Sequence, residues 1–220
     1  MTGLYVDSVI KSFDNKQILT DIYLTCKEGE IIGLLGRNGS GKSTLLQIIF
    51  GSLKADTKFI KINDRIVNHL HETHNQIKYL PQDNFLPRHL KTKRIISLFC
   101  DNDEAERITN NGFIKPLLDK KVRDLSGGEK RLIEILLILY SSAKFILVDE
   151  PFTGIAPIYI ETIKDIIREQ SKSKGLIVTD HDYLNIYNIA TRIIMIYDGG
   201  IKEIQDKKEL KYWGYIPESA

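Results

Sequence analysis

Gly36-Arg37-Asn38-Gly39-Ser40-Gly41-Lys42-Ser43 is the stretch of this chain that decides its fold. It matches the pattern GxxxxGK followed by Ser or Thr at every fixed position. The apolar run at 31–35 predicts a buried parallel strand, and residues 42–50 predict a helix that ends at Gly51. Because strand, loop and helix occur in this order, the sequence favours a phosphate-binding loop over a chance glycine-rich turn.

The residue types in this loop suit a nucleotide phosphate. Glycines allow a tight turn whose amides point inward, and the helix start adds its positive dipole end. Lys42 supplies a point charge for the β- and γ-phosphates, and the Ser43 hydroxyl is placed to bind Mg²⁺. The expected nucleotide-binding residues of this segment are Gly36, Asn38, Gly39, Ser40, Gly41, Lys42, Ser43 and Thr44.

The rest of the chain alternates between strand and helix patterns. Residues 3–13 and 18–26 are rich in β-formers, and 58–80 contain two or three further short strands. Residues 84–124 are more polar and predict short helices. Three more apolar runs, at 145–148, 176–178 and 193–196, are separated by helical segments. This alternation predicts an α/β fold with a mainly parallel sheet, and the length fits a single domain over residues 1–220.

An acidic pair follows one of the predicted buried strands. The run Phe145-Ile146-Leu147-Val148 leads directly into Asp149 and Glu150, and ligands of open α/β sheets bind at the carboxyl ends of strands. Asp149 is placed to hold Mg²⁺, directly or through water. Glu150 is placed to polarise an attacking water, since phosphoryl transfer depends on positioning and charge stabilisation. The alternative, a solvated acidic turn, is disfavoured because the phosphate loop is present.

Leu125-Ser126-Gly127-Gly128-Glu129 is a second informative stretch. One interpretation is structural, because Ser126 and Glu129 form the capping box S-x-x-E before an apolar helix. The other is functional: each glycine in a helix costs about 1 kcal/mol relative to alanine, yet it lets a phosphate approach the backbone. The second interpretation gives the chain two anion-binding helix starts, which one nucleotide uses only if they converge on it.

Composition excludes several classes of protein. The net charge is +2, from 31 basic and 29 acidic residues, so nothing favours nucleic-acid binding. Cys26 and Cys100 lack any paired spacing and are expected to be reduced thiols of a cytosolic protein. The N-terminal residues do not resemble a secretory signal, and no apolar run of about 18 residues predicts a membrane span.

GRNGSGKST at 36–44, Gln82, LSGGE at 125–129, ILVDEP at 146–151 and His181 occur in an order that resembles the nucleotide-binding subunit of an ABC (ATP-binding cassette) transporter. The resemblance covers about residues 3–205. It implies a P-loop NTPase (RecA-like) core with a mainly parallel sheet, a small antiparallel β subdomain and a short α-helical subdomain at about 84–126. It also implies ATP and Mg²⁺ as ligands.

The same resemblance implies partners and a location. In that family the LSGGE segment faces the phosphate loop of a second ABC ATPase subunit, identical or not, so Ser126, Gly127 and Gly128 would complete the partner's site. Hydrolysis would drive a transmembrane permease subunit on a separate chain, with this subunit peripheral on the cytoplasmic face of a membrane. The alternative is a soluble ABC ATPase without a transport role, such as the type used in iron–sulfur cluster assembly.

Three further residues take roles from the resemblance. Gln82 resembles the glutamine that contacts Mg²⁺ and the attacking water, and His181 resembles the histidine that contacts the γ-phosphate. With Glu150 they form the expected catalytic set, and Ser43, Gln82 and Asp149 form the expected metal site. Phe13 resembles the aromatic residue that stacks on adenine; packing in the core is its alternative.

The chain departs from the family pattern at two places. Ala156 stands where the family usually has aspartate, and with Pro157 next it is expected at the N-cap of a helix. In the family that aspartate reaches toward the other subunit's phosphate loop, so weaker coupling between the two sites is expected. The segment 82–125 also looks shorter than the family's usual helical subdomain. Two interpretations of Leu86, Pro87, His89 and Leu90 stay open: contact with a membrane partner, or filler on a small subdomain. The histidines at 69, 71 and 74 do not have metal-site spacing.

Overall fold

A computed structural model describes residues 2–73 and 75–216 of the chain. Its centre is a six-stranded sheet in the order β10-β9-β3-β8-β7-β6. All neighbouring pairs are parallel except β9 and β10. The strands are β3 (Ile31–Leu35), β6 (Ile77–Leu80), β7 (Phe145–Asp149), β8 (Gly175–Thr179), β9 (Arg192–Tyr197) and β10 (Gly200–Ile204). The apolar runs predicted to be buried strands are therefore strands of one mainly parallel sheet.

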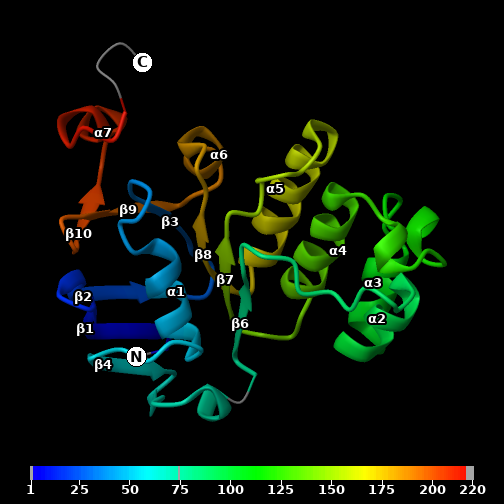
Figure 1. The fold of residues 1–220 in the computed structure, drawn as a ribbon, viewed down its shortest axis with the longest axis horizontal. Coiled ribbons are helices and arrows are strands. Elements are labelled where there is room, and N and C mark those ends of the chain that lie inside the picture. The colour runs from blue at the N-terminus through cyan, green and yellow to red at the C-terminus, as the bar shows by residue number, and fades with distance from the viewer. Residues whose placement is uncertain (1, 74, 217–220) are drawn as a thin grey trace.

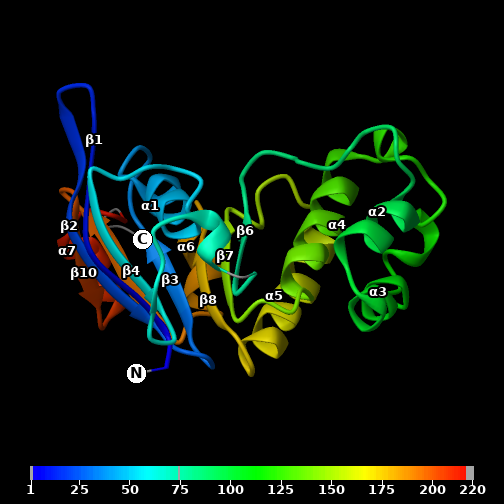
Figure 2. The same ribbon diagram turned by 90° about the horizontal axis from the view of Figure 1, so that it is seen from below.

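A smaller antiparallel sheet in the order β2-β1-β4-β5 lies beside the central sheet, at the left of Figures 1 and 2. Its strands are β1 (Leu4–Phe13), β2 (Lys16–Cys26), β4 (Thr57–Ile62) and β5 (Arg65–Ile66). Asp14 and Asn15 form the turn between β1 and β2, with Phe13 paired to Lys16. The predicted antiparallel part of the fold is confirmed.

The two faces of the central sheet carry separate apolar clusters, because alternate side chains of a strand point to opposite faces. Along β3, Ile32 and Leu34 join the cluster that contains helix α1 (Lys42–Phe50) and the antiparallel sheet. Ile31 and Leu35 join the cluster on the opposite face. Helix α1 is thus packed between the two sheets (Figure 1).

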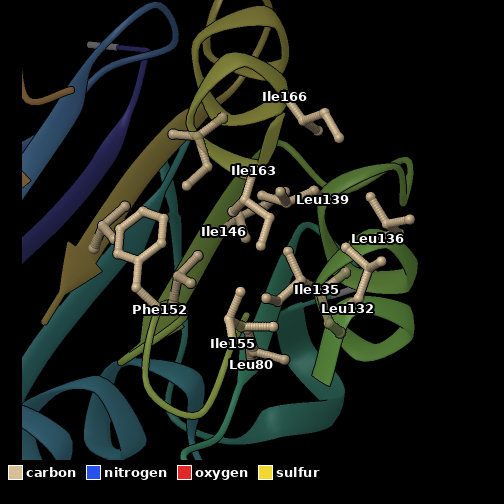
Figure 3. Close-up of a cluster of buried hydrophobic side chains, with 14 of the residues drawn as sticks. Leu80, Leu132, Ile135, Leu136, Leu139, Ile146, Phe152, Ile155, Ile163 and Ile166 are labelled. Atoms are coloured by element: carbon tan, nitrogen blue, oxygen red, sulfur yellow. The ribbon is translucent and has the colours of Figure 1, made fainter. Parts of the chain in front are cut away.

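The opposite face is covered by helices α4 (Gly127–Leu139), α5 (Pro157–Ser171) and α6 (Tyr183–Tyr187). Figure 3 shows Ile163 of α5 and Leu139 of α4 near Ile146 of β7, and all three belong to one apolar cluster. This contact fixes α4 beside the strand that carries the acidic pair.

Two short helices, α2 (Thr92–Phe99) and α3 (Asn102–Thr109), lie at the outer end of the molecule beyond α4 (Figures 1 and 2). Buried isoleucines at 95, 96 and 108 attach them to the cluster around α4. Short 3₁₀ turns at Leu70–Thr73, Lys115–Leu117 and Val122–Asp124, and helix α7 (Lys207–Tyr212), complete the fold. Within the described ranges, every helix is too short or too polar to cross a lipid bilayer.

The carboxyl ends of four parallel strands place the predicted site residues at one edge of the sheet. The phosphate loop follows β3, Gln82 follows β6, Glu150 follows β7, and His181 follows β8. Since parallel strands point the same way, segments that are far apart in the sequence meet there.

Candidate active site

The phosphate loop has a backbone that requires glycine at defined positions. Gly36 and Gly41 have φ of 153° and 104°, a region that other residues rarely adopt. A Cβ on Gly36 would lie 2.5 Å from Ser40 Oγ, and one on Gly41 would lie 2.8 Å from Leu19 Cδ2. Gly41 is also the N-cap of α1, so the loop delivers the amides of the first helical turn to its concave side.

The side chain of Lys42 folds back over the phosphate loop. Its Nζ donates to the carbonyl oxygens of Gly36 at 2.7 Å and Arg37 at 3.3 Å. Burial lowers the pKa of Lys42, and the nearby carboxylates of Glu150 and Asp149 oppose that effect. Lys42 therefore places a cation at the centre of the cradle, close to two carboxylates.

A hollow of about 410 Å³ opens above the loop, within the size range of small-ligand sites. It is lined by Phe13, Ile18, Asn38, Gly39, Gly41, Lys42, Ser43, Thr44, Gln82, Glu150 and His181. The buried Ser40 Oγ in the same loop has no hydrogen-bond partner among the described residues. Gly36 and Ser40, which were expected to bind the nucleotide, do not line this hollow. The glycine-lined cradle and the buried ammonium of Lys42 fit a nucleotide phosphate.

The three residues predicted to be catalytic meet directly. Glu150 is only 4% exposed, and its Oε2 accepts a hydrogen bond from Gln82 Nε2 at 2.8 Å. Its Oε1 lies 2.9 Å from His181 Nε2. Glu150 has a φ of +51°, a conformation that costs a residue other than glycine about 1–2 kcal/mol. The backbone N–H of Glu150 donates to the Thr179 carbonyl at 3.0 Å, which holds the turn after β7 against β8.

Asp149 lies one layer below the hollow and does not line it. It is 0% exposed; its Oδ1 accepts from Thr179 Oγ1 at 2.8 Å and its Oδ2 accepts from the Tyr79 hydroxyl at 3.0 Å. Burial, together with the Asp149 charge, raises the pKa of Tyr79 well above its usual value, so Tyr79 stays a donor. Both carboxylate oxygens are thus held in place, which fits a water-mediated metal contact better than a direct one.

The other members of the expected metal site, Ser43 and Gln82, line the hollow. Hydroxyl, amide and carboxylate oxygens are the ligand types that Mg²⁺ takes beside nucleotide phosphates. In the described part of the chain no three His, Cys, Asp or Glu residues cluster as a metal site. This donor set therefore suits a metal that binds together with the nucleotide, and its binding here stays a prediction.

Phe13 lies at the rim of the hollow and is 45% exposed, so it is not a core residue. The Nζ of Lys11 lies 4.8 Å from the centre of its ring. An exposed aromatic ring at the mouth of a phosphate site fits the predicted stacking on a base.

The structural interpretation of LSGGE is confirmed, and the phosphate-binding interpretation stays a prediction. Ser126 is the N-cap of α4, with the Glu129 N–H 3.2 Å from Ser126 Oγ and the Ser126 N–H 2.7 Å from Glu129 Oε2. A Cβ on Gly128 would lie 3.3 Å from the Gly154 carbonyl oxygen, whereas one on Gly127 would meet no described atom within 4 Å. Neither Ser126 nor the two glycines line this chain's own hollow. Packing within the chain therefore explains Gly128 but not Gly127.

Several residues of the site were missed by the sequence analysis. Ile18 lines the hollow next to Phe13, and Tyr79 and Thr179 fix Asp149. The guanidinium of Arg131 contacts the backbone behind the site. Tyr79 and Thr179 lie at the ends of predicted strands beside the ligand edge, which was a usable signal. Arg131 had no such signal, because it lies inside a helix that the sequence predicts to be apolar.

The structure also bears on three expectations outside the hollow: the partner contact at Leu86, the helix start at Ala156 and the histidines near residue 70. Leu86 is 7% exposed and packs in the core around α4, so its proposed role in a partner contact is wrong. Ala156 is the N-cap of α5 as predicted, without a capping side chain. The His69 and His71 rings stack on each other at 5.6 Å, and His74 lies outside the described residues.

Comparison with known proteins identifies the family. The model of the ABC transporter family matches residues 19–153. The chain is 31% identical over 216 residues to the lipopolysaccharide export system ATP-binding protein LptB of Haemophilus influenzae, covering 91% of this chain and 89% of that protein. It is 32% identical over 213 residues to the LptB of Escherichia coli, covering 90% and 88%. The chain belongs to the ABC transporter family.

Solved structures of ABC proteins share the fold. An ATP-binding subunit of an ABC transporter superposes with a TM-score of 0.85 at 22% identity, over 97% of this chain and 94% of that one. A nucleotide-free ATP-binding cassette superposes with a TM-score of 0.80 at 25% identity, over 99% and 97%. The predicted P-loop α/β fold is confirmed. This ABC protein is an ATP-binding transporter subunit and an ATPase coupled to transport, and its relatives do not favour the soluble alternative.

Proposed function

We propose that this single ABC domain, with its helical subdomain at about 84–126, hydrolyses Mg-ATP using Glu150 as the base. The observation that carries this proposal is the arrangement around Glu150, whose two carboxylate oxygens face Gln82 and His181 above the Lys42 cradle. ATP supplies the phosphoryl group that is transferred to water. The chain's own residues bind the phosphates, orient the water and accept its proton.

The proposed role of each residue follows from its position in the hollow. Lys42 and the amides of residues 38–44 bind the phosphate oxygens, and Phe13 stacks on the base. Ser43, Gln82 and, through water, Asp149 hold Mg²⁺. The Glu150 carboxylate takes the proton of the attacking water, while Gln82 and His181 hold that carboxylate in line. His181 is half-exposed and lines the hollow, where its ring would reach the terminal phosphate of bound ATP.

We further propose that a second ABC ATPase subunit docks on the start of α4. Ser126 and Gly127 lie outside this chain's own hollow, and no atom of residues 2–73 or 75–216 lies close enough to require glycine at 127. A phosphate approaching that helix start from another subunit would require a residue without a side chain. The dimer would act on a separate transmembrane permease, from the cytoplasmic face of the membrane.

Glu150→Gln tests the catalytic proposal. The amide keeps the size of the side chain but cannot accept the proton, so turnover should fall at least about a hundredfold while a fluorescent ATP analogue still binds. Glu161→Gln is the matched control, because Glu161 is an exposed carboxylate on α5 paired with Lys164 at 2.8 Å. Turnover of Glu150→Gln close to that of the control would remove Glu150 from the role.

Two further measurements test the partners. ATP-loaded Glu150→Gln should elute as a dimer in size-exclusion chromatography with light scattering, and Gly127→Val should elute as a monomer. Affinity purification from detergent-solubilised membranes should recover a multi-span membrane protein. A monomeric ATP-loaded Glu150→Gln, or a dimeric Gly127→Val, would contradict the proposed dimer. Recovery of a soluble partner alone would contradict the proposed permease.

A further inference from the structure

Arg131 is a buried cation that the proposed mechanism has not yet used. It lies on α4 five residues after the Ser126 cap, and its side chain points away from solvent, with 5% of the residue exposed. Its charge is matched by Glu134, whose Oε2 lies 3.4 Å from Arg131 Nη1. A buried pair of this kind costs desolvation energy and is a poor source of stability by itself. The further contacts of the guanidinium therefore need a reason.

The guanidinium hydrogen-bonds the backbone of both catalytic segments. Nη1 donates to the Pro81 carbonyl at 2.7 Å, directly before Gln82. Nη2 donates to the Asp149 carbonyl at 2.7 Å and to the Glu150 carbonyl at 3.2 Å. One planar group thus spans the two segments whose side chains meet at the Gln82–Glu150 hydrogen bond. The fixed fork of a guanidinium allows this, whereas a lysine ammonium is a single point donor.

Glu134 extends the same connection along the Gln82 segment. Its carboxylate is fully buried, and Oε1 accepts from the Phe85 N–H at 2.9 Å. Arg131 and Glu134 therefore hydrogen-bond the backbone at Pro81 and Phe85, which lie on either side of Gln82. Apolar packing in this region, where Figure 3 shows Leu132 and Ile135 beside Leu80 and Ile155, sets the spacing of the elements. Apolar packing has no direction, so directional hydrogen bonds are needed to fix the orientation of the peptide groups around Gln82.

The Glu150 backbone needs such support. Its φ of +51° is unfavourable for a residue with a side chain. The turn is held from one side by Thr179, which accepts from the Glu150 N–H. It is held from the other side by Arg131, which donates to the Glu150 carbonyl. Loss of either contact leaves the turn free to relax toward an ordinary conformation, which would move the carboxylate.

We propose that Arg131 is a positioning residue for ATP hydrolysis: it fixes Glu150 and Gln82 relative to each other and ties both to helix α4. Because α4 begins at Ser126, a shift of this helix moves the backbone of both catalytic segments through one side chain. The proposal rests on the proposed role of Glu150 as the base. Arg131 does not line the hollow, so it acts only through those two residues.

The test measures turnover and nucleotide affinity separately in the full-length chain. Arg131→Met removes all donors at similar length, and Arg131→Lys keeps the charge without the fork. Displacement of a catalytic group by about 1 Å costs up to about a hundredfold in rate, so kcat of Arg131→Met should fall at least about tenfold. KM and the Kd of a fluorescent ATP analogue should stay within about threefold, and Arg131→Lys should lie between wild type and Arg131→Met.

A double substitution separates positioning from general damage. If Arg131 acts through Glu150, adding Arg131→Met to Glu150→Gln should lower the residual rate by less than about twofold, because groups that act as a unit are not additive. Arg192→Met is the control for loss of a partly buried arginine. Arg192 contacts the Glu30 carboxylate at 2.7 Å and the Thr25 carbonyl, and it lies at the amino end of β9, away from the ligand edge. It should lower the melting temperature without lowering kcat.

The outcomes are distinct. A kcat of Arg131→Met within twofold of wild type, an equal fall in nucleotide affinity, or full additivity with Glu150→Gln would overturn the positioning role. If Arg131→Met does not fold, Arg131→Lys decides by the same measurements. A fully active Glu150→Gln would instead refute the proposed function and leave the contacts of Arg131 as structural.

Discussion

Replacing Ala156 with aspartate tests whether the helix after the catalytic turn is under-stabilised. Ala156 is the N-cap of the 15-residue helix α5, with φ of −66° and ψ of 138° and no side chain to accept from the first turn. An aspartate at this backbone conformation has its carboxylate within reach of the N–H groups of Ile158 and Tyr159. Pro157 at the first helical position already has the φ that the helix needs.

The size of the effect follows from these groups. A side-chain cap contributes about 1 kcal/mol relative to alanine, and a negative charge at a helix N-terminus adds about 0.5 kcal/mol. For a chain of this length, 1 kcal/mol raises the melting temperature by about 2–4 °C. Ala156→Asp should therefore unfold about 3–6 °C higher than wild type. Ala156→Ser, which caps without charge, should show about two thirds of that rise.

Thermal unfolding followed by circular dichroism, with urea denaturation as a second measure, checks the stability. The same variants test coupling between the two ATP sites, since the family aspartate reaches toward the other subunit. The Hill coefficient for ATP hydrolysis should rise in Ala156→Asp and stay at the wild-type value in Ala156→Ser. An unchanged melting temperature in both variants would refute the capping argument, and an unchanged Hill coefficient in Ala156→Asp would refute the coupling argument.

Two further predictions concern buried groups away from the site. Lys174 Nζ donates to the carbonyls of Leu139 at 2.6 Å and Ser141 at 2.5 Å and to Gln170 Oε1 at 2.8 Å, so Lys174→Met should cost about 2 kcal/mol of folding free energy. Urea denaturation measures this, and an exposed-site control, Lys172→Met, should change stability by less than about 0.5 kcal/mol; equal effects would contradict the reasoning. Burial raises the pKa of the Cys100 thiol to about 11, so iodoacetamide at pH 8 should alkylate it about a hundred times more slowly than a free thiol. The rate, followed by mass spectrometry, should climb with pH toward 11, and a plateau near pH 9 would show an ordinary thiol.

The strands and the phosphate loop were predictable because their signals are local. The buried run at 31–35, the glycines and Lys42 each favour the same structure through interactions with near neighbours. The cap at Ser126 and the uncapped start at Ala156 were predictable for the same reason, since a helix N-cap is set by two or three adjacent residues. The roles expected for Gln82 and His181 came from the family resemblance, and their contacts with Glu150 were found only in the structure.

Other features were not predictable because they depend on which atoms meet across the sheet. Asp149 was expected to hold Mg²⁺ directly or through water, and the sequence did not indicate that the hydroxyls of Tyr79 and Thr179, from two neighbouring strands, hydrogen-bond its oxygens. Leu86 was expected at a partner surface and is in the core, because the segment after Gln82 folds against α4. Its short apolar run, Phe85-Leu86-Pro87, has no helix or strand periodicity that would have indicated which side chain is buried.

The sequence by itself determined the family, the order of strands and helices, and all but Ile18 of the residues that line the hollow, because motif spacing and hydrophobic periodicity are properties of consecutive residues. Only the tertiary structure decided that Glu150 sits between Gln82 and His181 in a strained turn, and that Arg131 holds this turn from behind. The physical reason is that hydrogen bonds act over about 3 Å. Residues 81, 131 and 150 come within that range only when sheet and helix pack together.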